Sequence, residues 1–402
     1  MTRTILDIHI LQTVPPSNLN RDDTGTPKSA YYGGVRRARV SSQAWKRATR
    51  KAFNDLLPPE ELGVRTKKVA DALAKRIRAR ADSLPAVAIE LATETLKVAT
   101  GTKIDVPKRK GKNDEEPTAS PTSSYLMFLS QRQLDALAEL AIEGSGTDGD
   151  VDTLTEHFKK KENKAKARQA VDSRHSVDIA LFGRMVADSA DLNVEAATQV
   201  AHAISVHKSE IESDYYTAVD DLSTDEESGA GMIGTVDFNS ATLYRYAALD
   251  VDELQHNLGL GLRDDESPST PVEKAVGAFL EAFITSLPTG KINTFGNHTL
   301  PSAVIVKLRG RRPVSFAGAF EEPVPQGAGG GYLRESCRRL ASYVPDLEKQ
   351  YGIETKDDHS WVFRVGDETE ELSRLGERVS LEVLMRDVSA AVAQRLMPGA
   401  GA

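Results

Sequence analysis

The chain has 402 residues, of which 40% are hydrophobic and 27% charged, and its formal net charge is −8 at pH 7. This composition is typical of a globular protein with two or three folding units. Cys337 is the only cysteine, which excludes a disulfide within the chain. No apolar run approaches the roughly 18 residues that span a bilayer. Asp7 and His9 interrupt the first apolar stretch, so we expect no signal peptide and a cytoplasmic protein without membrane contact.

The first 60 residues predict a strand, a loop, a second strand and a helix. Residues 4–14 alternate between apolar and polar types, as in a half-buried strand. Residues 15–28 are rich in turn formers, and residues 35–40 are typical of a short strand. A helix is expected to begin at the N-cap residue types of positions 41–42 and to end before Pro58.

The remainder predicts a helical region followed by a mixed region. Residues 60–200 are mostly helical in pattern, with loops expected at 101–124 and 143–150. The later elements are expected as a loop at 221–234, a strand at 235–251, a helix at 271–287, a strand at 301–310, and helices around 332–350 and 369–396. This order favours an α+β fold built on a βαββαβ sheet of the ferredoxin-like or RRM kind.

One basic segment stands out in this acidic chain. Between Thr24 and Asn54 there are eight Lys or Arg residues and no Asp or Glu. Lys46 and Arg50 are four residues apart on the predicted helix, as are Arg47 and Lys51, so no carboxylate of the helix lies opposite them. Arg37 and Arg39 share one side of the preceding strand.

A solvated helix face is the ordinary explanation of such a segment. The missing carboxylates and the positive end of the helix dipole favour phosphate binding instead. We therefore interpret the segment as a track of phosphate sites on nucleic acid, which would position a strand without reading its sequence. Catalytic motifs are few: GxxxxGK[ST], GxGxxG and HExxH are all absent, so we predict no enzyme, cofactor or metal.

Six blocks resemble one known family. In chain order they are "NLNRDD", "GGVRRARVSSQAWKRATRK", "VDIALFGRM", "AHAISVHKSEIESDYYTAVDDL", "FNSATLYRYAALDVDEL" and "GKINTFGNHTLPSAVIV". They resemble the CasC family, the Cas7-type backbone subunit of the type I-E CRISPR surveillance complex Cascade, which serves antiviral defence. The resemblance extends from the first strand to about residue 325 and fades in the C-terminal stretch.

The resemblance implies a right-hand architecture. Its expected parts are a first part of an RRM-like palm at 1–58, helical fingers at 59–200, a thumb loop at 201–234, a second part of the palm at 235–325 and a C-terminal helical segment at 326–402. In this family, copies stack head to tail along a guide RNA, an interface that does not close on itself. The implied partners are the guide RNA, target double-stranded DNA, other copies of the chain and other Cascade subunits, with sequence read by base pairing.

The family's RNA contacts carry over to matching positions. They are Arg21, Lys28, Ser41, Gln43, Lys46, Arg50 and Lys291, to which the strand pattern adds Arg37 and Arg39. Met185 and Tyr216 match an apolar pair that packs against bases beside a kink in the RNA. A thioether and an aromatic ring can do so for any base, since every base has a π-face. Whether Tyr215 or Tyr216 stacks stays open.

The family's lysine-rich fingers helix grips duplex DNA, and "KKKENKAKAR" lies in the corresponding region, which makes Lys160, Lys161 and Lys164 the candidates. Two alternatives remain. One is a metal-dependent ribonuclease that cuts target RNA through the thumb residues Asp220 or Asp221. The other is a stand-alone RRM-like RNA binder, which is disfavoured because its two aromatic sheet motifs are not evident.

Overall fold

The computed structural model describes residues 3–81, 84, 87–105, 120–186, 189–218, 232–259, 261–263, 265, 267, 269–353 and 358–397. The chain divides into two compact units. Unit 1 comprises Met1–Phe53, Thr198–Val251 and Val276–Ala402, and unit 2 comprises Asn54–Ala197 and Asp252–Ala275. In the described residues, no helix is long and apolar enough to cross a bilayer.

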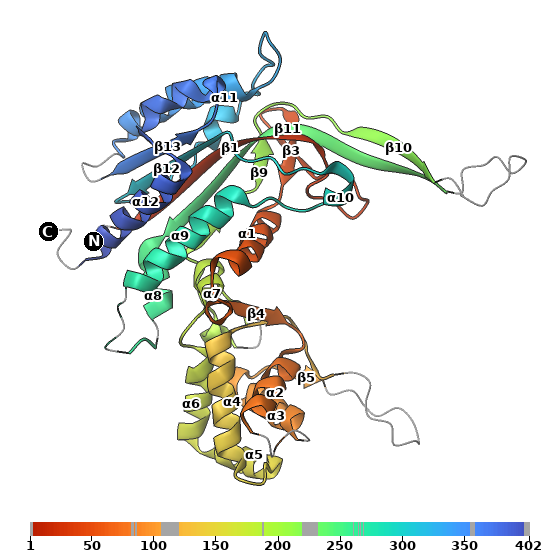
Figure 1. Cartoon of the computed structure of the whole chain (residues 1–402), viewed down its shortest axis with the longest axis vertical. Helices are drawn as coiled ribbons and strands as arrows, with labels where there is room; N and C mark the ends of the chain where they lie inside the picture. The colour runs from red at the N-terminus through yellow and green to blue at the C-terminus, as the bar shows by residue number, and fades with distance from the viewer. Residues whose placement is uncertain are drawn as a thin grey trace, which may run out of the picture. The chain divides into compact units, whose positions relative to one another are not determined.

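Unit 1 is a mixed α+β structure built on one large sheet (Figure 1). Its strands are β1 (Ile5–Ser17), β2 (Ser29–Tyr32), β3 (Val35–Val40), β8 (Thr198–Val200), β9 (Ala203–Ser205), β10 (Glu212–Ala218), β11 (Met232–Asp250), β12 (Ala303–Arg309), β13 (His359–Arg364) and β14 (Glu377–Arg378). Its helices are α1 (Ser42–Leu56), α9 (Ser269–Thr285), α10 (Ile292–Phe295), α11 (Leu333–Tyr351) and α12 (Leu381–Leu396), of which α1 ends and α9 begins in unit 2. Short 3₁₀ segments occur at Ala317–Phe320 and Asp367–Leu375.

The centre of the sheet is β1. It pairs antiparallel with β11 on one side and with β12 on the other, and the described strands follow the order β14-β13-β12-β1-β11-β9-β3-β2. Both faces of β1 are covered, because nine of its first ten positions, from Ile5 on, are almost inaccessible to solvent. β1 is therefore the buried central strand to which β11 and β12 are hydrogen-bonded.

The hairpin formed by β10 and the first part of β11 extends beyond this sheet (Figure 1). Tyr216 faces Gly234 across the hairpin, and Tyr215 faces Thr235. Since neighbouring residues of a strand point to opposite faces, the two tyrosines lie on opposite sides of the hairpin. The residues that would close it, 219–231, lie outside the described part of the chain.

Helix α1 is attached to the sheet through an aromatic stack. Trp45 is buried, and the Arg245 guanidinium on β11 lies 3.7 Å from the centroid of its indole ring and 4.8 Å from that of Phe283 on α9. Arg245 also donates to Gln12 Oε1 at 2.7 Å and to the Phe283 carbonyl. Burial lowers the pKa of Arg245 to about 9. A desolvated cation–π contact contributes about 2 kcal/mol, so this stack places α1 firmly over the sheet.

Arg37 corrects the interpretation of the basic segment. Its side chain is 0% exposed, and its guanidinium donates to four carbonyls, of Tyr32 at 3.1 Å, Ser205 at 3.0 Å, Phe320 at 2.9 Å and Glu321 at 3.0 Å. It therefore joins the β2–β3 hairpin to β9 and to the loop after residue 319, and it does not reach a phosphate. Gly33, at φ +59°, belongs to this joint, because a Cβ there would lie 1.6 Å from the Glu321 carbonyl oxygen.

Unit 2 is mainly helical. Its helices are α2 (Val69–Arg80), α3 (Ala88–Thr100), α4 (Gln131–Ser145), α5 (Val151–Lys159), α6 (Lys161–Val171), α7 (Val177–Phe182) and α8 (Val251–Gly259). Its short strands are β4 (Gly63–Thr66), β5 (Ile104–Asp105), β6 (Thr122–Ser123) and β7 (Met127–Ser130), with 3₁₀ turns at Pro59–Glu61 and Ala190–Leu192. Leucine and alanine side chains of α2, α3 and α4 supply half of its main core cluster, and Ser130 caps α4 reciprocally with Gln133.

The unit boundaries at Asn54 and Ala197 lie close to the expected fingers boundaries of 59 and 200. Residues 252–275, expected in the second part of the palm, belong instead to unit 2.

The C-terminal segment is not purely helical, as 326–402 was expected to be, because it contributes β13 and β14 to the sheet. The expected helix at 369–396 breaks at Gly376, where a Cβ would lie 2.4 Å from the Ser360 carbonyl oxygen. It resumes at α12, which Ser380 caps through the Val383 N–H.

A buried ionic network attaches α11 to the sheet. Arg309 donates to Asp7 Oδ2 at 2.8 Å and to Glu348 Oε1 at 2.6 Å, and Lys307 donates to Glu348 Oε2 at 2.8 Å. Tyr246 donates to the other oxygen of Asp7 at 2.8 Å. Two cations and two carboxylates thus balance one another inside unit 1, and α11 is held against β1 and β12 by charge as well as by its apolar face.

We expect Arg37→Ala to lower the free energy of unfolding by about 3 kcal/mol, since each buried carbonyl that loses its donor costs about 1–3 kcal/mol. The matched control is Arg36→Ala, at the exposed neighbouring position, which should stay within about 0.5 kcal/mol of the parent chain. Urea denaturation followed by circular dichroism measures both. Equal unfolding midpoints for the two variants would contradict the structural role of Arg37.

Candidate nucleic-acid interface

Ser41 starts α1 but does not present its side chain to a ligand. The residue is 4% exposed, and its Oγ accepts the Ala44 N–H at 3.3 Å. Its own N–H donates to Asn20 Oδ1 at 2.9 Å. Ser41 is thus an N-cap that joins the helix to the Asn18–Asp23 loop, which corrects the expectation of a direct RNA contact by its hydroxyl.

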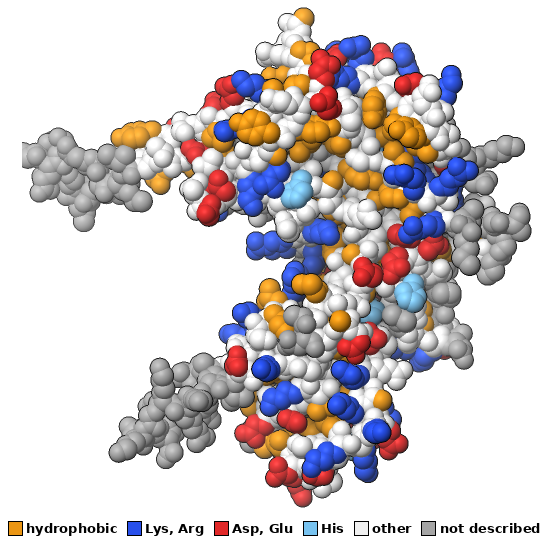
Figure 2. Space-filling model, turned by 180° about the vertical axis from the view of Figure 1, so that it is seen from behind, with side chains coloured by type: hydrophobic (Ala, Val, Ile, Leu, Met, Phe, Trp, Pro, Cys, Tyr) orange, Lys and Arg blue, Asp and Glu red, His pale blue; other side chains and the backbone are white. Residues whose placement is uncertain are grey.

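The basic side chains of α1 lie on two flanks of the helix. At 100° per residue, Lys46 and Arg50 fall beside the buried row of Trp45, Thr49 and Phe53, whereas Arg47 and Lys51 fall on the exposed face opposite that row. Figure 2 shows Lys and Arg side chains gathered where α1 lies, whereas over the helices of unit 2 they alternate with Asp and Glu.

Arg47 and Lys51 line an open cavity of about 500 Å³. Arg21 borders it from the loop after β1, and Lys291 borders it from the loop before α10. Asp22 is the one carboxylate among the lining residues. Four cations from three separate segments therefore surround one cavity, an arrangement that suits a polyanion.

A glycine permits this convergence. A Cβ at Gly290 would lie 2.4 Å from the carbonyl oxygens of both Asn18 and Leu19. Without a side chain, the Leu287–Lys291 loop can lie against the backbone of the Asn18–Asp23 loop. Lys291 is itself in the left-handed conformation, at φ 49°. The loop geometry thus sets Lys291 beside Arg21.

The other flank of α1 holds Lys46, Arg50 and, in the first turn, Gln43. Lys46 and Arg50 are half-buried and Gln43 is exposed. Burial lowers the pKa of Lys46 from its ordinary value. The ammonium group of Lys46 is therefore partly shielded from water.

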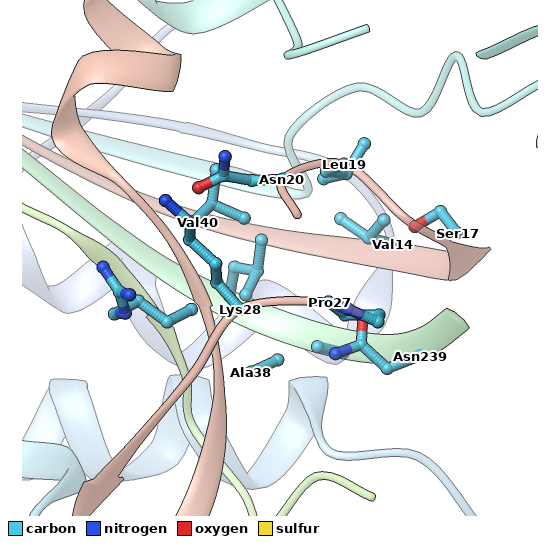
Figure 3. A pocket seen from close by; sticks show the side chains of 12 residues that line it. Val14, Ser17, Leu19, Asn20, Pro27, Lys28, Ala38, Val40 and Asn239 are labelled. Carbon is cyan, nitrogen blue, oxygen red and sulfur yellow. The ribbon is translucent and has the colours of Figure 1, made fainter. Parts of the chain in front are cut away.

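Lys28 and Arg39 belong to a second cationic group, next to His202. Arg39 donates from Nε to the Ser29 carbonyl at 3.2 Å, and its Nη1 lies 3.2 Å from His202 Nδ1. Lys28 and Arg39 also border a recess of about 20 Å³ with an apolar floor, too small for a base. Figure 3 shows Lys28, Asn20 and Val40 at one end of this recess and Val14 and Asn239 at the other.

The hairpin presents two exposed tyrosines. Tyr215 is 60% and Tyr216 is 45% exposed. The ring of Tyr216 lies over Gly234, because a Cβ there would lie 2.5 Å from its Cζ and hydroxyl oxygen. One face of the Tyr216 ring is thus supported by the hairpin backbone, and the ring offers a platform of fixed orientation.

Met185, in unit 2, is 81% exposed. The chain on each side of it is fixed: Arg184 pairs with Val194 through two backbone hydrogen bonds, and the Val186 N–H donates to Asn193 Oδ1 at 2.6 Å. The Arg184 side chain is buried and donates to the carbonyls of Leu192 and Val171. An apolar side chain is therefore held at the surface by a rigid backbone.

The proposed DNA-binding lysines are all exposed. Lys160 is the N-cap of α6, and Lys161 and Lys164 lie in its first turns. In the part of the chain that the structure describes, none of these three has an ion-pair partner. They lie at the positive end of the helix dipole, which disfavours cations unless an anion binds there.

Arg47, Lys51 and His202 were not among the predicted site residues. The sequence showed the charges on α1, but helical periodicity alone could not tell which flank borders a cavity. His202 carried no signal, because its neighbours Arg39 and Lys28 lie far from it in the chain. Among the described residues, no group of three or more His, Cys, Asp or Glu is arranged to hold a metal ion.

Residues 6–387 match the family model described as CT1975-like protein. Two similar solved structures are parts of RNA-guided assemblies. A chain of "CRISPR RNA-guided surveillance complex, pre-nicking" is 34% identical, with a TM-score of 0.79, over 96% of this chain and 100% of that one. A chain of "CRISPR RNA-guided surveillance complex" is 30% identical, with a TM-score of 0.67, over 96% and 99%. No curated protein matches the chain.

We expect Gly290→Ala to displace the Leu287–Lys291 loop and to lower stability by about 1–3 kcal/mol, the usual cost of overpacking. Hydrogen exchange should rise in the two loops that Gly290 brings together. The matched control is Gly259→Ala, where nothing lies within 4 Å of the new Cβ. Unchanged exchange in Gly290→Ala would contradict the close approach.

Proposed function

Since the chain belongs to the CT1975-like protein family, we propose that it is the guide-RNA-binding backbone subunit of a type I-E Cascade surveillance complex. The observation that carries this proposal is the meeting of Arg21, Arg47, Lys51 and Lys291 at one cavity. Cationic side chains bind the phosphate groups of a nucleic-acid backbone, and such contacts do not depend on the base sequence. A subunit that must hold any guide needs that property.

The sheet supports a palm of the ferredoxin-like kind. Within unit 1, β1, α1, β9, β11, α9 and β12 follow one another along the chain, and the four strands lie side by side as β12-β1-β11-β9. This is the strand order 4-1-3-2 of a βαββαβ plait. The helical unit 2 then takes the role of the fingers, and the β10–β11 hairpin that of the thumb.

The predicted RNA-binding residues are retained where their side chains reach the surface of the protein. Arg21, Lys28, Arg39, Gln43, Lys46, Arg50 and Lys291 remain proposed contacts, whereas Arg37 and Ser41 act within the protein. Arg47 and Lys51 join the set because they line the same cavity as Arg21. Met185 and Tyr216 are proposed to pack against bases beside a kink. The supported ring of Tyr216 favours it over Tyr215 for this role.

The remaining partners are also proposals. Copies of the chain would stack along the guide, other Cascade subunits would cap the array, and Lys160, Lys161 and Lys164 would hold duplex target DNA. We propose that the subunit itself is not catalytic. The ribonuclease alternative rests on Asp220 and Asp221, which lie outside the described residues.

We predict that Lys46→Glu combined with Arg50→Glu abolishes co-purification of guide RNA when the complex is expressed with its CRISPR array. Replacing two cations by two anions turns phosphate attraction into repulsion. The matched control is Arg374→Glu with Arg378→Glu, two exposed arginines at the C-terminal end of unit 1. It changes the net charge equally and should leave the bound RNA unchanged. Recovery of normal guide RNA with the first double variant would refute this role of α1.

We predict that Tyr216→Ala leaves the fold intact but exposes guide bases near the hairpin to chemical probing, because stacking on an aromatic ring is worth about 1–3 kcal/mol per base. Tyr215→Ala, on the opposite face of the hairpin, serves as the control and should leave the reactivity pattern as it is. The same pattern in both variants would count against stacking by Tyr216.

A further inference from the structure

The exposed imidazole of His202 lies beside two basic side chains of unit 1. The residue directly precedes β9, and its Nδ1 is 3.2 Å from Arg39 Nη1. The two charged groups that act on it are Arg39 on β3 and Lys28 in the segment before β2. The β2–β3 hairpin, with Arg39 on β3 and Lys28 directly before β2, and a remote segment at position 202 thus bring two permanent cations and one titratable base together.

The contact with Arg39 decides the protonation of the ring. A guanidinium can only donate, so at this distance Nδ1 must be the acceptor, and the proton of a neutral His202 is on Nε2. Adding a proton to Nδ1 would place two donors against each other. The protonated ring is therefore compatible with this position only if an acceptor enters between His202 and Arg39.

We propose that Lys28, Arg39 and His202 form a proton-linked site for one phosphodiester group of single-stranded RNA. A non-bridging phosphate oxygen would accept from Arg39 Nη1 and from the protonated His202 Nδ1, while Lys28 adds a third charge. The site rests on the proposed function, and it adds His202, together with a dependence on pH, to the contacts of that function.

Arg39 is suited to this role because it is already oriented. Its Nε donates to the Ser29 carbonyl at 3.2 Å, which leaves the outer nitrogens of the guanidinium to the ligand. A guanidinium with fixed orientation loses less conformational entropy on binding than a mobile one. Two cations and a protonated imidazole match the charge of a phosphodiester, so the group bound there is part of the RNA backbone.

The sign of the pH dependence follows from the charges. Burial and then the charges of Arg39 and Lys28 lower the pKa of His202 in the free protein. A bound phosphate offsets the two positive charges and raises that pKa. Binding therefore takes up a proton between the two pKa values, and the affinity for RNA increases as the pH falls through this window.

The test measures the affinity of the full-length chain for a fluorescent single-stranded RNA by anisotropy, from pH 5.5 to 8.0 at constant ionic strength. Each unit by which binding raises the pKa makes binding about tenfold tighter at the acidic end. His202→Gln should abolish this pH-dependent gain. His202→Arg should bind at pH 8.0 about as tightly as the parent chain binds at pH 5.5.

Two further measurements distinguish protonation of His202 from other effects of acidic pH on RNA binding. The log–log slope of affinity against salt should steepen at acidic pH in the parent chain and stay constant in His202→Gln, since only the protonated ring adds a cation to the RNA-binding surface. The control His256→Gln, at an exposed histidine of unit 2, should keep the full pH dependence. Thermal unfolding confirms that each variant is folded.

The outcomes distinguish a failure of the proposed RNA-binding function from a failure of the His202 site alone. If the parent chain fails to bind RNA at every pH, the proposed function fails, and this site fails with it. If the parent chain binds RNA and His202→Gln keeps the same pH dependence, the His202 site is refuted while the proposed function stands. Loss of the pH dependence in His202→Gln alone supports the site.

Discussion

The placement of α1 depends on one desolvated cation. Arg245 lies between Trp45 and Phe283 in the interior of unit 1, where burial lowers its pKa to about 9. A guanidinium can occupy such a position because its planar, delocalised charge is weakly hydrated and stacks on aromatic faces. The stack joins α1 and α9 to β11. Every basic side chain of α1 takes its position from this contact.

Basic groups thus have two separate uses in unit 1. Arg37, Arg245, Lys307 and Arg309 are buried and bind carbonyls, rings or carboxylates of the protein. Arg21, Arg47, Lys51 and Lys291 surround the open cavity. The buried group makes the fold specific, since removing a donor leaves several acceptors without partners. The second group lines the open cavity, where it can meet an external polyanion in a fixed geometry, which lowers the entropic cost of binding.

Much of the fold could be predicted from the sequence, but the assignment of individual basic residues could not. The strand at 35–40 and a helix starting at 41–42 agree with β3 and α1, because alternation, N-cap types and Pro58 are local signals. Alternation places Arg37 and Arg39 on one side of β3 but does not reveal what covers that side. The acceptors of Arg37 come from positions 205, 320 and 321, which no local pattern connects to it. The break at Gly376 could not be predicted for the same reason, because no local pattern shows that this glycine approaches the Ser360 carbonyl on β13.

Met185 illustrates how a rigid backbone affects association. Its neighbours on both sides, Arg184 and Val186, are hydrogen-bonded to Val194 and Asn193, so the backbone beside Met185 is held in place. A thioether side chain that stands in water gains roughly 25 cal/mol for every Å² of apolar area that a partner covers. Because the backbone beside Met185 is already ordered, covering this residue costs mainly the rotamer freedom of its own side chain, and more of the gain remains as affinity.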